Sequence, residues 1–131
     1  MDKSTAPEFS SRRIWFAFTG SAIVWTGHFV AIWFLGEVGC LGGLGNQTVL
    51  GINLIFGLSL IVTLLALILA VASGAIAYRI WQQVNELETQ DEIYASHERQ
   101  RFMALFGMLA ATLFTVAILV QTAPLFVIPI C

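Results

Sequence analysis

Three long stretches without charged residues constrain this chain more than any other feature. Residues 14–35, 49–78 and 102–123 contain no Asp, Glu, Lys or Arg. A helix needs roughly 20 apolar residues to cross about 30 Å of hydrocarbon, and each stretch reaches that length. Only 11% of the 131 residues are charged, whereas a soluble domain has about a quarter. The sequence therefore predicts an all-α integral membrane protein with three transmembrane helices, at about residues 14–36, 49–78 and 102–123.

The basic residues all lie on one side of the predicted spans. Lys3, Arg12 and Arg13 precede the first span, while Arg79, Arg99 and Arg101 lie between the second and the third. Basic residues collect on the cytoplasmic side of membrane proteins. We therefore expect the N-terminus inside and the C-terminus outside. The polar residues 1–11 form the expected cytoplasmic N-terminus, and residues 12–131 form a single three-helix transmembrane domain.

Two parts of the N-terminal region resemble known export signals. Arg12 and Arg13 before an apolar run are typical of a twin-arginine signal, and residues 37–40 resemble a lipoprotein cleavage site. The apolar core of a signal peptide has only about 7–15 residues, fewer than the first span. Glu37 also stands where a lipoprotein site normally has Leu. We therefore expect an uncleaved first helix that the two arginines anchor.

A glycine-rich segment separates the first two spans. Residues 39–45 contain four glycines, and glycine is among the poorest helix formers. We therefore expect the first helix to end near Glu37 and this segment to be a tight external loop. The side chain of Asn46 or Thr48 is then expected to cap the second helix, because both residue types accept hydrogen bonds from free helix N–H groups.

Helices 2 and 3 are predicted to form an antiparallel hairpin that extends beyond the membrane into the cytoplasm. The second helix should continue to about Glu88. Residues 89–92 (Thr-Gln-Asp-Glu) have the form of a capping box, so they predict the start of the third helix. Pro124 disfavours helical geometry in the residue before it, so the third helix should end near Thr122.

Small side chains follow one face of each span and predict where the helices pack. In the second span they recur at alternating spacings of four and three, at Ser59, Thr63, Ala66, Ala70, Ser73 and Ala77. The first span has Ala17, Gly20, Gly27 and Ala31, and the third has Ala104, Gly107 and Ala111. Small residues let helix backbones approach closely in lipid. Because three helices offer few neighbours, we expect some of these faces to contact another protein.

Two cysteines lie on the predicted external side. Cys40 follows the first span and Cys131 follows the third. The external compartment permits disulfides, so we expect a bond between the two cysteines that ties the loop to the tail. A dithiol site for Cu(I), which prefers soft thiolate ligands, and two free thiols remain the alternatives.

Four polar residues form a predicted outer polar layer at similar depth: His28, Glu37, Asn53 and Gln121. Intramembrane polar groups can form a hydrogen-bond network, face a partner, or bind a quinone head group or a proton. Nine residues separate His28 from Glu37, so the two side chains should project from opposite faces of one helix. Haem with two histidine ligands is not expected, because His97 lies on the other side of the membrane.

Several short motifs carry a resemblance to a known group of proteins. They are Trp25-x-x-His28-Phe29 followed by Trp33 and Cys40, then Arg101-Phe102-x-x-Leu105-x-Gly107, Gln121-x-x-Pro124 and Pro129-x-Cys131. This pattern resembles small uncharacterised bacterial three-helix membrane proteins associated with operons for haem–copper cytochrome c oxidase and its copper-delivery membrane factor. The resemblance implies an accessory subunit or assembly factor of a respiratory oxidase in the bacterial inner membrane. It implies no catalytic residues.

The sequence favours a non-catalytic accessory or assembly subunit of a larger membrane complex. Its expected partners are membrane lipid and other integral membrane subunits, without nucleic acid, and we expect no enzyme activity, cofactor or metal. One alternative is a small membrane protein that binds copper or quinone at the outer polar layer. A weaker alternative is an oligomeric transporter, whose pore should carry intramembrane charge. The spans offer only His28 for this role, with Glu37 at the edge.

Overall fold

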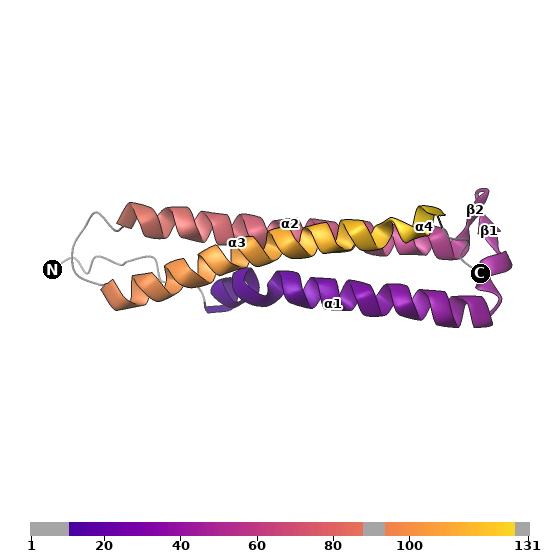
Figure 1. Ribbon diagram of the computed structural model, residues 1–131, viewed down its shortest axis with the longest axis horizontal. Coiled ribbons are helices and arrows are strands. Elements are labelled where there is room, and N and C mark those ends of the chain that lie inside the picture. Colours follow the sequence, from indigo (N-terminus) through magenta and orange to yellow (C-terminus); the bar gives the residue numbers. More distant parts are fainter. Residues whose placement is uncertain (1–10, 88–93, 128–131) are drawn as a thin grey trace.

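The computed structural model describes residues 11–87 and 94–127 of the chain and is almost entirely helical (Figure 1). Its helices are α1 (Ser11–Leu41), α2 (Leu54–Leu87), α3 (Tyr94–Thr122) and the short α4 (Pro124–Val127). The segments Arg12–Leu41, Leu54–Glu86 and Glu98–Val127 are each long and apolar enough to cross a membrane. The predicted all-α class is therefore confirmed, with three helices long and apolar enough to span a membrane.

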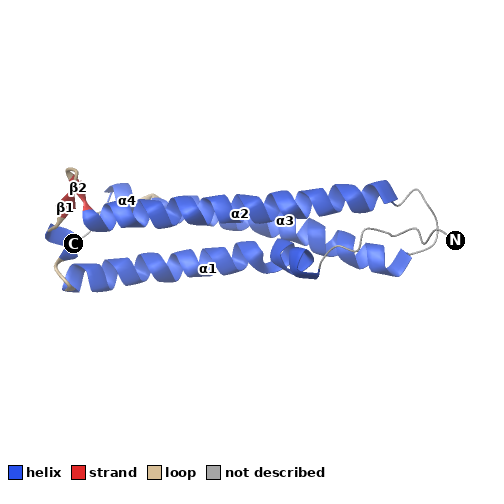
Figure 2. Ribbon diagram, turned by 180° about the vertical axis from the view of Figure 1, so that it is seen from behind, coloured by secondary structure: helices blue, strands red, loops and turns tan. Residues whose placement is uncertain are grey.

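The three long helices lie side by side in a narrow bundle (Figures 1 and 2). At 1.5 Å per residue, their 29 to 34 residues give lengths of about 44 to 51 Å. The hydrocarbon core is only about 30 Å thick, so the helix ends extend beyond it. Each long helix packs against the other two, and α2 and α3 form the most extensive contact.

The small-residue face of α2 is the centre of the bundle. All six of its predicted packing residues are at most 5% exposed: Ser59, Thr63, Ala66, Ala70, Ser73 and Ala77. The same spacing continues to buried Ile55, Ile80 and Val84 at the two ends. Ala104, Gly107 and Ala111 of α3 are also buried, as predicted. On α1 the prediction is correct for Ala17 and Gly20, whereas Gly27 is exposed and Ala31 is only partly buried.

The bundle's closest contact surrounds Gly107 of α3. A methyl group added at this glycine would overlap the carbonyl oxygen of Ala17 on α1, and it would lie 3.3 Å from Cβ of Ala77 on α2. The neighbouring Gly74 of α2 approaches Ala111 in the same way, at 3.0 Å. Three helix backbones therefore meet here with no room for a larger side chain.

The outer surface of the bundle is apolar. Large aliphatic and aromatic side chains are more than half exposed along all three helices, among them Ile23, Phe34, Leu64, Ile68, Leu109 and Leu113. A soluble monomer rarely exposes a continuous apolar surface of this extent. In a bilayer these side chains contact lipid tails or the helices of other proteins.

The end of α1 differs from the prediction. The helix does not stop near Glu37 but continues through Gly39 and Cys40 to Leu41. Gly39 is buried, and a methyl group placed there would lie 2.9 Å from Cδ1 of Ile55 on α2. Close packing against α2 therefore stabilises one further helical turn despite the low propensity of glycine. The chain reverses at Gly43, whose φ of 73° is the left-handed conformation that glycine adopts readily.

A short β-hairpin, which the sequence analysis did not predict, connects α1 to α2 (Figure 2). A 3₁₀ turn at Leu44–Asn46 leads into β1 (Thr48–Val49), which pairs antiparallel with β2 (Ile52–Asn53). Leu50 and Gly51 form the turn with φ values of 55° and 79°, as in a type I′ turn. The predicted span beginning at residue 49 therefore starts as a helix only at Leu54.

Asn53 is the residue that caps α2. Its Oδ1 accepts hydrogen bonds from the backbone N–H groups of Ile55 at 2.9 Å and Phe56 at 3.4 Å. Its Nδ2 donates to the carbonyl oxygen of Gly45 at 2.6 Å. The expectation that Asn46 or Thr48 would cap this helix is wrong, because the hairpin delays the start of α2.

The observed end of α3 agrees with the prediction. α3 ends at Thr122, immediately before Ala123 and Pro124, as expected. α2 is described to Leu87. Glu88 and the predicted capping box at residues 89–92 lie outside the described residues.

Candidate functional site

His28 is the most deeply buried ionisable side chain of the described chain. It projects from α1 into the bundle and is 3% exposed. Its Nε2 lies 3.0 Å from Oγ1 of Thr63 on α2, which is also 3% exposed. If the threonine hydroxyl donates, Nε2 accepts and the proton of the neutral ring is on Nδ1.

Gln121 brings the third helix to this position. Its side chain interacts with the imidazole of His28. Nδ1 of His28 and Oε1 of Gln121 are both buried and lack a hydrogen-bond partner among the described residues. In the tautomer given above one of these atoms can donate and the other can accept. Thr63, His28 and Gln121 thus bring polar side chains of α2, α1 and α3 together, and we call this group the polar chain.

Aromatic and aliphatic side chains surround this polar chain. Trp25, one turn before His28, packs against Phe114 of α3 with ring centroids 5.3 Å apart, and against Phe29 at 6.2 Å. Trp25 also contacts the buried cluster of Ala66, Ala70 and Ile118. The indole Nε1 of Trp25 is buried without a partner in the described part of the chain. The polar groups therefore lie in a largely apolar environment.

The other members of the predicted outer polar layer do not join His28. Asn53 caps α2, as described above, and Glu37 is exposed on α1. The exposure of Glu37 and the burial of His28 agree with the predicted opposite faces of the helix. Of the four predicted residues, only His28 and Gln121 come together.

Thr63 is the partner that the sequence analysis missed. The sequence predicts it only as a small residue of the α2 packing face. Its place on that inward face is the sequence signal for a contact between helices, but the sequence does not show that Thr63 lies level with His28. Ser73, on the same face, also makes a contact between helices, since its Oγ donates to the carbonyl oxygen of Phe16 at 3.1 Å.

Cys40 lies one residue before the end of α1 and is partly buried. No cysteine among the described residues is a free thiol. Its predicted partner, Cys131, lies outside the described residues, so the Cys40–Cys131 bond stays a prediction.

Metal-binding groups do not cluster in residues 11–87 and 94–127. In these ranges no three His, Cys, Asp or Glu side chains gather closely enough to hold a metal ion. His28 has a hydroxyl and an amide as neighbours, and both are weaker metal ligands than a thiolate or a second imidazole. The arrangement joins α1 and α2 through the contact between His28 and Thr63, and Nδ1 of His28 can donate one hydrogen bond, either to Gln121 or to a ligand. No known protein family, curated relative or solved structure matches this chain.

Proposed function

We propose that this protein is a non-catalytic accessory or assembly subunit of a larger membrane complex in the bacterial inner membrane. In the proposed orientation the N-terminus lies in the cytoplasm and the C-terminus outside. The location of all basic residues before the first span or between the second and third supports this orientation.

The observation that carries the proposal is an exposed glycine on α1. A methyl group added at Gly27 would meet no atom of the described residues within 4 Å. On the same helix, a methyl group added at Gly20 or Gly39 would lie about 3 Å from the side chain of Ser73 or Ile55, respectively. In lipid, small residues stabilise a helix chiefly by letting another helix approach. Gly20 and Gly39 have such a neighbour, whereas Gly27 has none among the described residues.

The residues around Gly27 complete a helix-packing surface. Ile23, Val30 and Phe34 follow the spacing of three and four on the same exposed side. Bulky side chains that flank a glycine form a shallow groove, which suits the ridge of another transmembrane helix. Glu37 is exposed near the outer end of α1, where it can hydrogen-bond to a polar group of that partner.

A respiratory partner is the more specific part of the proposal. It rests on the resemblance of the Trp25–Cys40 and Arg101–Cys131 motifs to small proteins associated with cytochrome oxidase operons. The absence of a metal-ligand cluster in the described ranges fits an accessory role, because such a subunit needs no redox centre of its own.

Co-purification tests the proposal. The full-length protein is purified in a mild detergent, and its partners are identified by mass spectrometry. Gly27→Leu should remove the partner, whereas Ala75→Leu, the same kind of change at an exposed site on α2, should retain it. A chain that always purifies alone, or equal partner loss in the two variants, would contradict the proposal.

Ligand binding at His28 is the second candidate function. The buried Nδ1 of His28 and Oε1 of Gln121, which lack partners, favour it. A quinone carbonyl could accept from Nδ1, and a metal ion could bind there after the proton leaves. Quinone and copper are measured in the purified wild type and in His28→Ala. Absence of both from the wild type rules this candidate out.

A further inference from the structure

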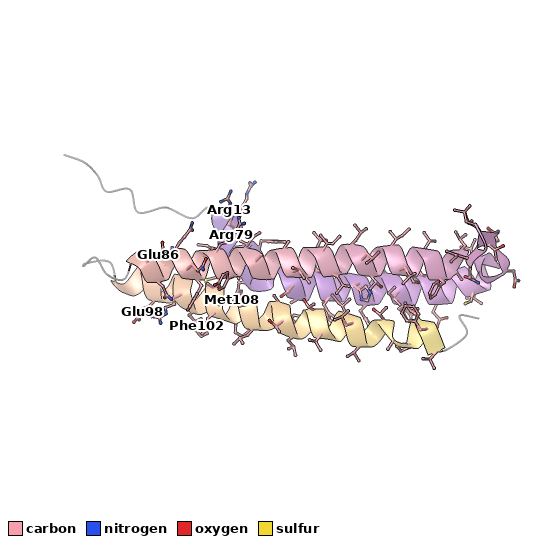
Figure 3. The ribbon with its side chains drawn as sticks, turned by 90° about the horizontal axis from the view of Figure 1, so that it is seen from above. Arg13, Arg79, Glu86, Glu98, Phe102 and Met108 are labelled. Atoms are coloured by element: carbon pink, nitrogen blue, oxygen red, sulfur yellow. The ribbon has the colours of Figure 1, made fainter. Side chains whose placement is uncertain are left out.

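A second polar feature lies at the opposite end of the bundle from His28. A cavity of about 350 Å³ opens between α1 and α2, lined by Arg13, Ile76, Arg79, Ile80 and Gln83. Figure 3 shows Arg13 and Arg79 next to one another although they come from different helices. The volume lies within the range of small-molecule sites, about 300–1,000 Å³. Two arginines from different helices therefore line one hollow.

The cavity lies at the level of the lipid head groups. Arg13 directly precedes the first apolar stretch, and Arg79 directly follows the second. Exposed Trp15 lies two residues beyond Arg13, and exposed Tyr78 stacks on Trp81 with ring centroids 6.2 Å apart. Tryptophan and tyrosine concentrate at the boundary between hydrocarbon and water. The two arginines therefore face the head groups of the leaflet that holds the N-terminal end of α1.

The charges of the lining favour an anion. No carboxylate in the described ranges pairs with Arg13 or Arg79. Glu86 is seven residues beyond Arg79, or about 10 Å along the helix. Figure 3 shows Glu86 near the C-terminal end of α2 and Glu98 near the N-terminal end of α3. A guanidinium group binds phosphate oxygens with two parallel hydrogen bonds, and the amide of Gln83 offers a further donor.

The apolar part of the lining indicates the source of the phosphate. Ile76 and Ile80 contribute aliphatic surface beside the two arginines, and Ile76 lies within the uncharged stretch of α2. A free phosphate ion gains nothing from such surface, whereas a phospholipid can place its glycerol and upper acyl chain against it. Basic pockets between transmembrane helices at the head-group level favour anionic lipids in this way.

We infer that the cavity between α1 and α2 binds the phosphate of an anionic phospholipid through Arg13 and Arg79. Gln83 contributes a hydrogen bond, and Ile76 and Ile80 contact the apolar part of the lipid. The inference is independent of the proposed accessory function, because it needs only a bundle embedded in a bilayer.

Native mass spectrometry of the full-length protein in a mild detergent tests the inference. Phosphatidylglycerol and phosphatidylcholine are added separately, and the fraction of lipid-bound protein is measured. Phosphatidylglycerol should bind more tightly. Each arginine near a head group contributes about a five-fold change in affinity, so Arg13→Gln and Arg79→Gln should each weaken phosphatidylglycerol binding by about that factor. Arg79→Lys, which keeps the charge, should lose less.

Arg12→Gln is the matched control, since it makes the same charge change at the neighbouring position, which does not line the cavity. Equal losses in Arg12→Gln and Arg13→Gln would show a general charge effect and overturn the inference. Equal binding of the two lipids would overturn it as well. A third arm adds inorganic phosphate in excess. If phosphate displaces the bound lipid and itself binds as tightly, the site is one for free phosphate and the lipid assignment is wrong.

Discussion

Substitution of Gly107 by alanine tests whether the three helices meet as closely as the structure shows. The added methyl group would overlap the carbonyl oxygen of Ala17 and lie 3.3 Å from Cβ of Ala77. Backbone atoms cannot rotate out of the way, so at least one helix must move outward. Overpacking of this kind typically costs about 1–3 kcal/mol, and we expect the upper part of that range because the obstacle is backbone.

Helix propensity does not offset this cost. In water, replacing glycine by alanine stabilises a helix by about 1 kcal/mol. A transmembrane segment stays helical even when its bundle comes apart, because lipid offers its backbone no other hydrogen-bond partner. The propensity difference therefore nearly cancels between the packed and separated states. Gly27→Ala is the matched control, since its methyl group meets no atom within 4 Å, and we expect a change within about 0.5 kcal/mol.

The assay is unfolding of the purified protein by increasing SDS in mixed micelles. Tryptophan fluorescence reports the transition, because Trp25 and Trp81 pack against the two buried clusters of the bundle. Gly107→Ala should unfold at clearly lower SDS than the wild type, with helix content by circular dichroism unchanged. Equal midpoints for Gly107→Ala, Gly27→Ala and the wild type would refute the close contact at Gly107.

The same unfolding assay measures the polar contacts. Thr63→Val keeps the shape of the side chain and removes its bond to His28, so we expect a loss of about 0.6 kcal/mol, the average for such bonds in membranes. His28→Ala also leaves a cavity and should cost more, about 1–3 kcal/mol; a stable His28→Ala would contradict the three-helix polar chain. Asn53→Ala removes the cap of α2 and should cost about 1 kcal/mol, and a loss of zero would argue against the cap. A maleimide reagent should label Cys40 and Cys131 only after reduction, whereas labelling of both without reductant would exclude the predicted disulfide.

The long-range features of the fold could be predicted because they depend on simple periodicities. The length of an uncharged stretch is enough to predict a membrane span. The alternating spacing from Ser59 to Ala77 places small residues on a single face of a helix, and that face is buried in the bundle. The end of α3 follows from the backbone restriction that Pro124 imposes. Each of these features is local or repeats along one helix.

The connection between α1 and α2 could not be predicted because tertiary contacts override local preferences there. Gly39 is a poor helix former, but its packing against Ile55 extends α1 by about one turn. Leu50 adopts a positive φ, which is uncommon for a residue with a branched side chain, so no turn signal marks the hairpin. Because α2 begins only at Leu54, Asn53 caps this helix, whereas the sequence predicts it inside the second span.

The partner of His28 was missed for a related reason. The sequence places Thr63 on the packing face of the second span but does not show that it lies at the depth of His28. The register between α1 and α2 depends on the unpredicted connection, which adds a turn to α1 and a hairpin before α2. Gln121 could be placed at the correct level because Pro124 fixes the end of its helix.

The burial of the small residues changes which surface should contact a partner. The sequence suggested that three helices could not cover every small-residue face, but those of α2 and α3 are covered within the chain. Their presence therefore says nothing about other subunits. The outward face of α2 carries large aliphatic residues such as Leu64 and Ile68, which suit lipid tails. Only α1 exposes Gly27 among aromatic and branched side chains, so the case for a complex depends on that helix. A partner that binds α2 in preference to α1 would remove the structural support for the proposed function.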